Sequence, residues 1–482
     1  MTSSLQPSPT ILLPHLPPKT LVGIDLITFT STANFQGIRD LPKGWHFLYT
    51  GTTESLSLRC GAWFYVGDIS TAGHGQNDSA LVKRDQSTGP AIYIWKWKSD
   101  TESLSSLRQN SDSDRQDAMR FKANLGAIWQ SGGLFRYRSR VSPAMLSNQG
   151  SSSQSRAQAA DDDETEASGR KDWRQLTDWL SPSLLTRIIG DPETDVDGHP
   201  RWHLTSAGTA DRDADHIPGL DKPNEGSTEN VGNREDEKEF GFLPIDLKQT
   251  WREGAIGRER TEAAQDRTWA LGDLILRNSS SVSGETTIDE RTGELQVLGE
   301  LQFTFLMVIT MMNFSCLQQW KRLLELILTC RQAILDRETF MSDVIRLLLW
   351  QLQRSDDVEG GLFEIDGDGG GAFLLRLLKK LKLSVDQVVE NEAQSKVKTE
   401  LEKLGAWVKE EYDWELEHET VLKRGKIQLE DGEEIEMEMD DNDEYEETGE
   451  YAPVIVDLDE GSVKHDATYD YGEMSDLEDM RY

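Results

Sequence analysis

LGELQFTFLMVITMMNFSCLQQWKRLLELIL, residues Leu298 to Leu328, is the stretch that decides the fold. In its second half, apolar residues recur at helical spacing and polar residues fill the positions between them. The apolar positions are Leu317, Trp320, Leu324 and Ile327, and the polar positions are Gln318, Lys321, Arg322 and Glu325. This pattern is typical of an amphipathic helix that buries one stripe of its surface.

The first half of the stretch is almost entirely apolar. No charged residue occurs from Leu301 to Trp320, a length of about 20 residues that would just cross a bilayer. Polar side chains are nevertheless scattered through it, at Gln302, Thr304, Thr310, Asn313, Ser315, Gln318 and Gln319. We therefore predict a buried core helix, with a membrane-spanning helix as the alternative.

Helical spacing continues towards the C-terminus. Further apolar stripes occur at Phe340, Val344, Leu348 and Leu352, and then at Val397, Leu401, Leu404, Val408 and Tyr412. Helices that each carry one apolar stripe are stable when they bury one another. We expect a helical bundle or a short solenoid from Gly241 to about Glu419.

The chain before this region is rich in short aromatic and β-branched runs that turn-forming residues separate. In AIYIWKWK, Ala91 to Lys98, the residues Tyr93, Trp95 and Trp97 fall on one face of a strand. We predict a β-rich, sandwich-like domain over residues 1–146, with a helix around Asp117 to Trp129 packed on its sheet.

Polar, low-complexity segments set the predicted boundaries. Residues 147–170 predict a disordered linker, and residues 205–239 predict a disordered insertion within an α-helical domain over residues 171–428. Residues 429–482 predict a disordered acidic tail. The predicted fold class is a multidomain α+β chain, with a β-rich domain, an all-α domain and a tail that carries one recognition strand.

Negative charge is concentrated in this tail. The chain has a net charge of −35, and residues 430–482 hold 22 acidic and two basic residues. Such a tail disfavours general affinity for nucleic acid or anionic membranes and favours basic protein surfaces. The three cysteines, Cys60, Cys316 and Cys330, are far apart, and the N-terminus lacks the basic start of a signal peptide. We therefore expect a cytoplasmic and nuclear protein.

The sequence contains no strong catalytic motif. His199 and His203 lie four residues apart, but Gly198 and Pro200 favour a turn, and no third metal ligand is evident. DGDGGGAF, Asp366 to Phe373, lacks the alternating oxygen ligands of a calcium loop and predicts a flexible connector. We expect no catalysis, no metal and no cofactor.

The stretch LFRYRSR, Leu134 to Arg140, alternates basic and aromatic residues. The basic residues are Arg136, Arg138 and Arg140, and the aromatic residues are Phe135 and Tyr137. On a strand they would form a small basic and aromatic surface that suits RNA. The simpler interpretation is a solvated sheet edge whose arginine stems lie over apolar neighbours, and the acidity of the whole chain favours it.

An apolar run interrupts the acidic tail at YAPVIVDLDE, Tyr451 to Glu460. A lone strand has no partner for its backbone groups, so we predict that this run docks on a sheet edge. The flexible acidic spacer before it favours the edge of another protein, by β-augmentation, and the chain's own N-terminal domain is the alternative. The docking residues would be Ala452, Val454, Ile455, Val456, Asp457 and Leu458.

Four stretches together resemble the a1-cistron splicing factor family, which comprises assembly factors of the U5 small nuclear ribonucleoprotein. They are GIDLITFTSTANFQGIRDLPKGWHFLYTG (Gly23 to Gly51), LRCGAWFYVGD (Leu58 to Asp68), the block from Leu298 to Leu328, and APVIVDLDEG (Ala452 to Gly461). The stretches occur in the family's order, and the block LGELQF…WKRLL is the most specific of them.

The resemblance implies a factor without catalysis that binds the large U5 scaffold protein, at its RNase H-like and Jab/MPN-like domains, and blocks premature helicase binding. It implies U5 snRNP proteins as partners, and we expect a chain that is monomeric alone and contacts no membrane. The acidic tail suggests an alternative, a chaperone of basic proteins such as histones or ribosomal proteins. Ser475, with acidic residues after it, is a candidate phosphorylation site.

Overall fold

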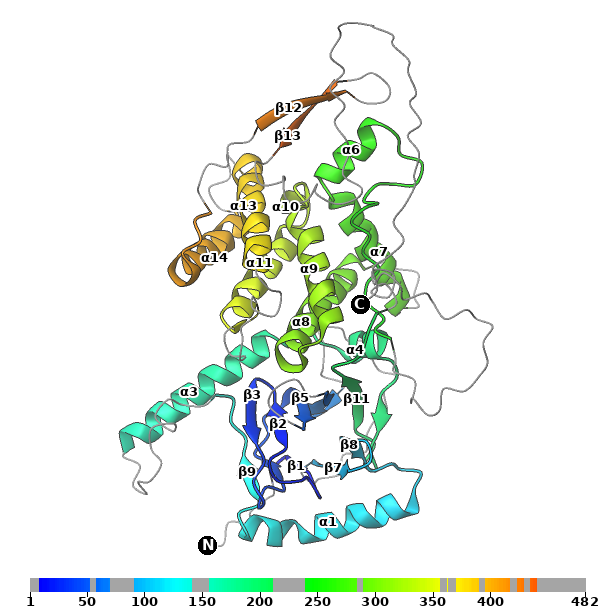
Figure 1. Ribbon diagram of the computed structural model, residues 1–482, viewed down its shortest axis with the longest axis vertical. Coiled ribbons are helices and arrows are strands. Elements are labelled where there is room, and N and C mark those ends of the chain that lie inside the picture. Colours follow the sequence, from blue (N-terminus) through cyan, green and yellow to red (C-terminus); the bar gives the residue numbers. More distant parts are fainter. Residues whose placement is uncertain are drawn as a thin grey trace, which may run out of the picture. The chain divides into compact units, whose positions relative to one another are not determined.

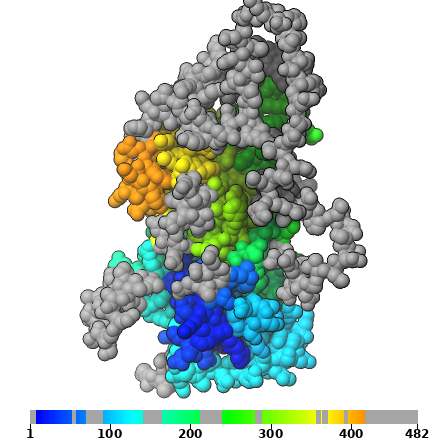
Figure 2. Space-filling model, viewed as in Figure 1, coloured from blue at the N-terminus to red at the C-terminus, as the bar shows by residue number. Residues whose placement is uncertain are grey.

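The computed structural model describes residues 8–52, 58–69, 91–140, 156–210, 239–283, 289–355, 362, 370–389, 395–416, 423–428 and 434–439. The chain divides into two compact units, Met1–His418 and Glu419–Tyr482. In the first unit, two packed sheets are followed by a layer of helices (Figure 1). Blue surface comes from the N-terminal strands of the sheets, and yellow to orange surface comes from the later helices (Figure 2).

The two sheets contain the strands of the N-terminal region and a pair from further along the chain. In spatial order the first sheet consists of β8 (Ser103–Ser106), β7 (Ile92–Lys98), β1 (Thr10–Leu12), β4 (Gly37–Arg39) and β9 (Leu134–Arg136). The second consists of β10 (Glu193–Thr194), β11 (Pro200–Thr205), β6 (Arg59–Val66), β5 (Gly44–Gly51), β2 (Leu21–Ile24) and β3 (Ile27–Thr30). Neighbouring strands are antiparallel, except that β1 is parallel to β7 and β4 is parallel to β9.

The second sheet lies at the centre of the fold because both of its faces are covered. Successive side chains of a strand point to opposite faces. In β5, Trp45, Phe47 and Tyr49 join a core shared with the helices, whereas Leu48 joins the core between the two sheets. This arrangement explains why β5 and β6 are buried along nearly their whole length, and it confirms the predicted sandwich.

Helix α1 (Asp112–Gln130) covers the outer face of the first sheet (Figure 1). Ile94 of β7 lies beneath this helix, whereas Tyr93, Trp95 and Trp97 face the core between the sheets. The structure therefore confirms both the predicted helix on the sheet and the predicted alternation of AIYIWKWK.

Helices make up the rest of the first unit. They are α3 (Arg156–Gln175), α4 (Pro182–Ile189), α6 (Arg258–Gln265), α7 (Thr268–Ser283), α8 (Glu290–Met311), α9 (Phe314–Leu328), α10 (Ala333–Asp336), α11 (Glu338–Leu352), α13 (Gly370–Val388) and α14 (Lys396–Tyr412). The apolar stripes predicted for α9, α11 and α14 are buried, except that Tyr412 is half-buried. The predicted helical region is confirmed.

Helix α8 is the core helix of this layer. It contacts α4, α7, α9, α11 and strand β6. By length and composition it would suit a membrane span, but 89% of its most apolar window is buried inside the protein. Its polar groups are also paired: the Gln302 amide accepts a hydrogen bond from the Trp179 N–H and donates one to the Gln175 carbonyl, both at 3.0 Å. Burial and pairing support the core-helix prediction.

Helix α3 corrects the predicted linker at 147–170. The helix occupies Arg156–Gln175, and its last turn is anchored on the sandwich by Trp173. The Trp173 indole N–H donates to the Trp45 carbonyl at 2.7 Å, and the Trp173 ring stacks on Trp63 with the ring centres 5.9 Å apart. Alanine and arginine, both good helix formers, are frequent in α3, so the polar composition alone was a poor guide to disorder here.

Strands β10 and β11 correct the predicted start of the helical domain at residue 171. Strand β11 pairs antiparallel with β6, with Trp202 opposite Trp63. Residues 193–205 therefore complete the second sheet before helices α6 to α14 begin. Residues 211–238 of the predicted insertion lie outside the described residues.

The second unit contains a two-stranded hairpin. Strand β12 (Lys423–Gln428) pairs antiparallel with β13 (Glu434–Met439). This hairpin corrects two predictions, that the helical domain extends to residue 428 and that the chain is disordered from residue 429. In EIEMEM, Ile435, Met437 and Met439 alternate with glutamates, a period of two that suits a strand.

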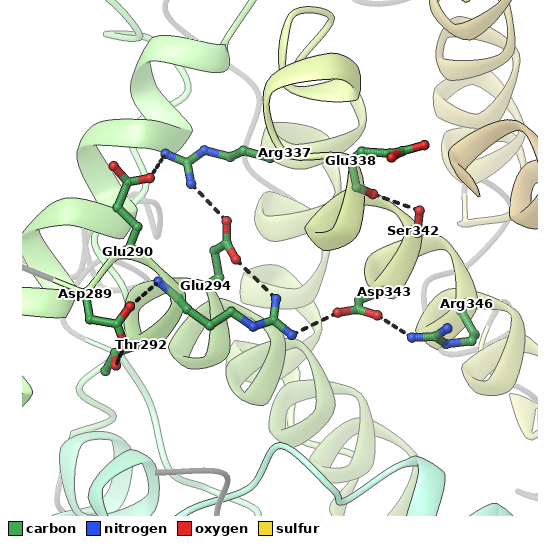
Figure 3. Close-up of polar contacts among 10 residues, drawn as sticks. Asp289, Glu290, Thr292, Glu294, Arg337, Glu338, Ser342, Asp343 and Arg346 are labelled. Carbon is green, nitrogen blue, oxygen red and sulfur yellow. Dashed lines mark hydrogen bonds and ion pairs between the residues drawn. The ribbon is translucent and has the colours of Figure 1, made fainter. Parts of the chain in front are cut away.

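Ion pairs connect the first turns of α8 and α11 (Figure 3). Arg337 pairs with Glu290 at 2.8 Å and with Glu294 at 2.9 Å. Arg291 pairs with Glu294 and Asp343, both at 3.1 Å. Because neighbouring pairs share a carboxylate, they form a network, which contributes more than isolated surface pairs do.

Gly293 allows the close crossing of α7 and α8, and we expect Gly293→Ala to destabilise the protein. A Cβ at this position would lie 2.1 Å from the Ile275 carbonyl oxygen, a backbone atom that has little freedom to move. Overpacking of this kind costs about 1–3 kcal/mol, which exceeds the gain of about 0.8–1 kcal/mol in helix propensity. Chemical denaturation measures the change in the free energy of unfolding.

Gly272 is the matched control, because it lies in α7 and a Cβ there meets no atom within 4 Å. Gly272→Ala should be neutral or stabilising. Equal effects of the two substitutions would contradict the close crossing.

Candidate protein-binding surface

The sandwich has one open side, where an edge strand of each sheet ends. Strand β3 is the last strand of the second sheet and β9 is the last strand of the first, and both lie on the same side of the sandwich (Figure 1). Aromatic rings fill the space between them: Phe35 lies 5.2 Å from Phe29 and 5.0 Å from Phe135, measured between ring centres. Phe135 remains 36% exposed.

Arginines form the rim of this open side. Arg136 and Arg140 are exposed and Arg138 is half-buried, whereas Tyr137 between them is buried. Arg136 lies 4.0 Å from Asp40. We call β3, β9, the three phenylalanines and these three arginines the open sandwich edge.

The structure thus supports the simpler interpretation of LFRYRSR, a solvated edge strand with arginines beside apolar neighbours. Of its two aromatic residues, Phe135 alone is exposed, so the stretch offers one ring for stacking. Contact with RNA stays a prediction.

A surface pocket of about 280 Å³ continues the open sandwich edge beyond Arg138. The Ser139 N–H donates to the Glu166 carboxylate at 2.9 Å, and the Ser139 hydroxyl donates to the Glu166 carbonyl at 2.8 Å. A Cβ on Gly169 would lie 2.6 Å from the Ser139 hydroxyl, so glycine allows α3 to approach. The lining residues are Leu26, Ile27, Thr28, Ser139, Arg140, Gly169, Asp172 and Arg354.

A buried polar cluster beneath this surface connects its two edge strands. Asp25 lies in the turn between β2 and β3, and Tyr137 immediately follows β9. The Asp25 carboxylate accepts hydrogen bonds from the Tyr137 hydroxyl at 2.6 Å, from His46 Nδ1 at 2.8 Å and from the Phe47 N–H at 2.9 Å. All three side chains of the cluster, Asp25, His46 and Tyr137, are at most 3% exposed.

His46 is protonated in this arrangement because both ring nitrogens face acceptors. Nδ1 faces the Asp25 carboxylate, and Nε2 lies 2.9 Å from the Pro42 carbonyl oxygen, which has no proton to donate. Burial by itself lowers the pKa of His46, but the Asp25 charge and these hydrogen bonds raise it overall above its ordinary 6.5. Burial and the Asp25 charge raise the pKa of Tyr137 well above its ordinary value.

The sequence analysis missed this cluster, although it quoted the stretches that contain it. The available signal was one charged or ionisable residue within each apolar run: Asp25 in GIDLITF and His46 in GWHFLYTG. Buried polar residues of this kind need partners.

We expect the stability that His46 supplies to depend on pH. Its folded-state pKa is raised, so the contribution is fully present below about pH 6.5, the unfolded value, and is lost as the pH rises through the folded value. The measurement is the difference in the free energy of unfolding between wild type and His46→Gln, from about pH 6 to about pH 9. That difference should shrink as the pH rises. A His46 difference that stays flat over this range would show that the ring is neutral in the folded protein.

A second polar cluster lies in the turn between β10 and β11. Ligand atoms of Asp195, Asp197 and His199 come within 4.8 Å of one another. Three contacts already engage them: Asp195 accepts hydrogen bonds from the His199 N–H at 2.8 Å and from its Nδ1 at 2.9 Å, and the Lys122 ammonium pairs with Asp197 at 2.6 Å. The lysine supplies the positive charge here, so we assign the cluster to closing the turn.

This arrangement separates His199 and His203, the two histidines considered above as metal ligands. His199 belongs to the turn, whereas His203 lies on strand β11, so they do not share the face of a helix. Of Asp366 to Phe373, the last four residues begin helix α13, and the others lie outside the described residues.

The turn between α8 and α9 exposes a pair of apolar side chains. Met312 is 39% exposed and Phe314 is 64% exposed, although Asn313 between them is buried. The Asn313 amide donates to the Ser206 and Gly208 carbonyls at 3.0 and 2.8 Å. The turn is therefore fixed to the sheet while its apolar side chains face outwards.

The predicted docking residues lie outside the described residues: Ala452, Val454, Ile455, Val456, Asp457 and Leu458, together with Ser475. Docking by this segment stays a prediction.

Comparison with known proteins identifies two matched regions. A model of the AAR2 N-terminal domain matches residues 7–190, and a model of the AAR2 C-terminal repeat region matches residues 242–417. The first region includes α3 and α4, which agrees with their contacts to the sandwich. A curated relative from Pongo abelii, described as Protein AAR2 homolog, is 22% identical over 358 residues, which are 71% of this chain and 75% of that protein.

Proposed function

The chain belongs to the AAR2 family of splicing factors, and from that premise we propose that it binds the large scaffold protein of the U5 small nuclear ribonucleoprotein during assembly. The expected contacts on the scaffold are its RNase H-like and Jab/MPN-like domains. Binding there holds off the helicase until the particle matures. The proposal includes action without catalysis, a monomeric free protein, and residence in both cytoplasm and nucleus.

The observation that carries this proposal is the occurrence of both AAR2 regions, in order, on one chain. The tail adds a physical reason for binding a protein. Val454 and Val456 share one face of an extended strand within a tail that is otherwise strongly acidic. Such a strand gains backbone partners only by adding to a sheet edge.

Replacing Val454 and Val456 by aspartate is expected to weaken the complex with the scaffold by about tenfold and to abolish exclusion of the helicase. Each buried valine contributes about 1.5–3 kcal/mol, and ordering each backbone residue costs about 1–2 kcal/mol. The strand alone therefore binds weakly, and it acts because the folded regions keep its effective concentration high. A competition pull-down on the scaffold's C-terminal fragment measures both effects.

Val463→Asp is the matched control for this experiment, because it adds a similar charge outside the predicted strand. The control should exclude the helicase as wild type does. If the double aspartate variant also excludes it fully, exclusion belongs to the folded regions and not to the tail.

The alternative function, an acidic chaperone of basic proteins, is favoured by the 22 acidic residues within 430–482. The same variants distinguish this chaperone from a factor that docks through its tail strand. A charge-based chaperone tolerates Val454→Asp/Val456→Asp and loses activity when the acidic residues of the tail are replaced by their amides. A strand-docking factor shows the reverse.

A further inference from the structure

We infer that the free edge of β3 and the surface pocket beside it bind an extended, acidic segment of another protein. The segment adds to β3 through backbone hydrogen bonds, and one of its carboxylates pairs with Arg140. We call the free edge of β3 together with this pocket the β3 groove. The groove lies on the folded part of the chain and depends on neither the scaffold nor the tail, so it goes beyond the proposed function.

The first observation is that the backbone of Thr28 points away from its own sheet. Strand β3 pairs with β2 on one side, and no described strand pairs with its other side. Just after β3, the Ser31 N–H donates to the Thr20 carbonyl at 2.8 Å. Backbone groups alternate in direction along a strand, so Ser31 and every second residue before it face β2. The N–H and C=O of Thr28 therefore face the free side.

The second observation is that this free side faces a hollow. Leu26, Ile27 and Thr28 line the pocket of about 280 Å³, and Gly169 of α3 lines it as well; α3 begins its last turns beside β3 (Figure 1). Successive residues of a strand point to opposite faces. Since Ile27 and Thr28 both line the pocket, it lies along the edge of β3, where an added strand would run.

The third observation is the charge of the pocket. Two arginines and one aspartate line it, and Arg354 pairs with Asp172. Arg140 is exposed, and among the described residues no carboxylate lies within ion-pair distance of it. One positive charge is therefore left without compensation, which favours an acidic segment over a neutral or basic one.

The apolar residues of the groove set a second requirement for the segment. Leu26 and Ile27 are half-buried, so they lose further contact with water when a strand covers them, which stabilises the complex. The segment that fits the groove thus combines apolar, β-branched residues with acidic residues.

RNA phosphates also pair with arginine, but two features of the groove favour a peptide. Asp172 places a negative charge in the pocket, and the net charge of the chain is −35, and both disfavour a polyanion. The outward N–H and C=O of Thr28 match the backbone of another strand.

A defined peptide tests the charge pairing in the full chain. The probe is a fluorescein-labelled peptide of about seven residues in which valine alternates with aspartate, and fluorescence anisotropy measures its binding. We expect it to bind about threefold to fivefold more tightly than the same peptide with asparagine in place of aspartate. Arg140→Gln should abolish this preference. Arg115→Gln, the same change at an exposed arginine on α1, should preserve it.

Thr28 supplies the test of strand pairing. Thr28→Pro removes the outward N–H and places a ring where the added strand would lie, and edge strands tolerate proline where the N–H faces solvent. We expect this variant to fold, as thermal unfolding will show, and to bind the aspartate peptide at least about tenfold more weakly. Thr28→Val keeps the N–H and the size of the side chain, so it should bind as wild type does.

No binding of the aspartate peptide at millimolar concentration overturns the inference, as does an aspartate preference that is absent or that persists in Arg140→Gln. Equal binding by Thr28→Pro and Thr28→Val overturns the strand pairing; if Thr28→Pro does not fold, the Arg140 comparison decides. A labelled oligouridine that binds more tightly than the peptide would assign the groove to RNA. A free chain that dimerises in sedimentation, and becomes monomeric in Thr28→Pro, would assign it to a second copy.

Discussion

Glu300→Ala is expected to lower the free energy of unfolding by about 3–5 kcal/mol, the range for removing one partner of a buried ion pair. Glu300 is fully buried in α8. Its carboxylate pairs with the Arg187 guanidinium at 2.7 Å and accepts hydrogen bonds from the Leu243 N–H at 3.0 Å and the Gln319 amide at 2.7 Å. The substitution leaves all three donors without this acceptor.

The position of these donors explains why the effect extends beyond one helix. Arg187 lies in α4, within the matched N-terminal region, whereas Leu243 and Gln319 lie in the C-terminal region. Glu300 therefore joins the two family regions through a single carboxylate. We expect the variant to lose stability and scaffold binding together, as measured by denaturation and pull-down.

Glu290→Ala is the control for Glu300, because both residues lie in α8 and pair with an arginine. Glu290 pairs with Arg337 at 2.8 Å, but its side chain is 55% exposed, and exposed pairs contribute about 0–1 kcal/mol. Glu300→Gln should fall between the two alanine variants, since the amide oxygen keeps one acceptor. If Glu300→Ala costs no more than Glu290→Ala, then the carboxylate does not join the two regions.

The local periodicity of apolar residues was sufficient to predict those helices and strands that bury one face. The helical stripe of α9 and the alternation of β7 are both found in the structure, because one side of each faces a core. The scattered polar residues of α8 correctly indicated a core helix. Their partners, such as Trp179 for Gln302, were not predictable, since they lie more than a hundred residues away in the sequence.

The missed features share this dependence on distant parts of the chain. Strand β11 joins β6 across a long separation in sequence, and nothing in PRWHLT itself indicates that neighbour. The open sandwich edge was predicted as a solvated strand from LFRYRSR, but its aromatic floor needs Phe29 and Phe35 from another strand and a loop. The cluster of Asp25, His46 and Tyr137 likewise forms only when three segments come together.

Asp25→Asn is expected to destabilise the protein by about 3–5 kcal/mol, because it removes the charge that compensates the buried His46 imidazolium. Asparagine keeps the backbone preference, since Asp25 has a φ of 56°, a conformation that both residues tolerate. The amide also turns its NH2 group either towards His46 and the Tyr137 hydroxyl, which share one carboxylate oxygen, or towards the Phe47 N–H on the other oxygen, and all three donate to the carboxylate. The pKa of His46 should then fall, since its burial is no longer opposed.

Asp40→Asn is the matched control, since Asp40 also has a positive φ, 62°, and also forms an ion pair, with Arg39 at 2.7 Å. Its side chain is 33% exposed, so the substitution should change stability by less than about 1 kcal/mol. The two variants share chemistry and backbone conformation and differ in burial. Equal losses would mean that the backbone, and not the buried charge, sets the stability of this turn.

Tyr137→Phe tests the same cluster from the segment that follows β9. It removes only the 2.6 Å hydrogen bond to Asp25, and hydrogen bonds to charged groups contribute about 1.5–3 kcal/mol. The substitution should therefore lower the free energy of unfolding by less than Asp25→Asn does. Equal losses in the two variants would show that the Tyr137 hydroxyl, and not the pairing of Asp25 with the buried His46, dominates the stability of the cluster.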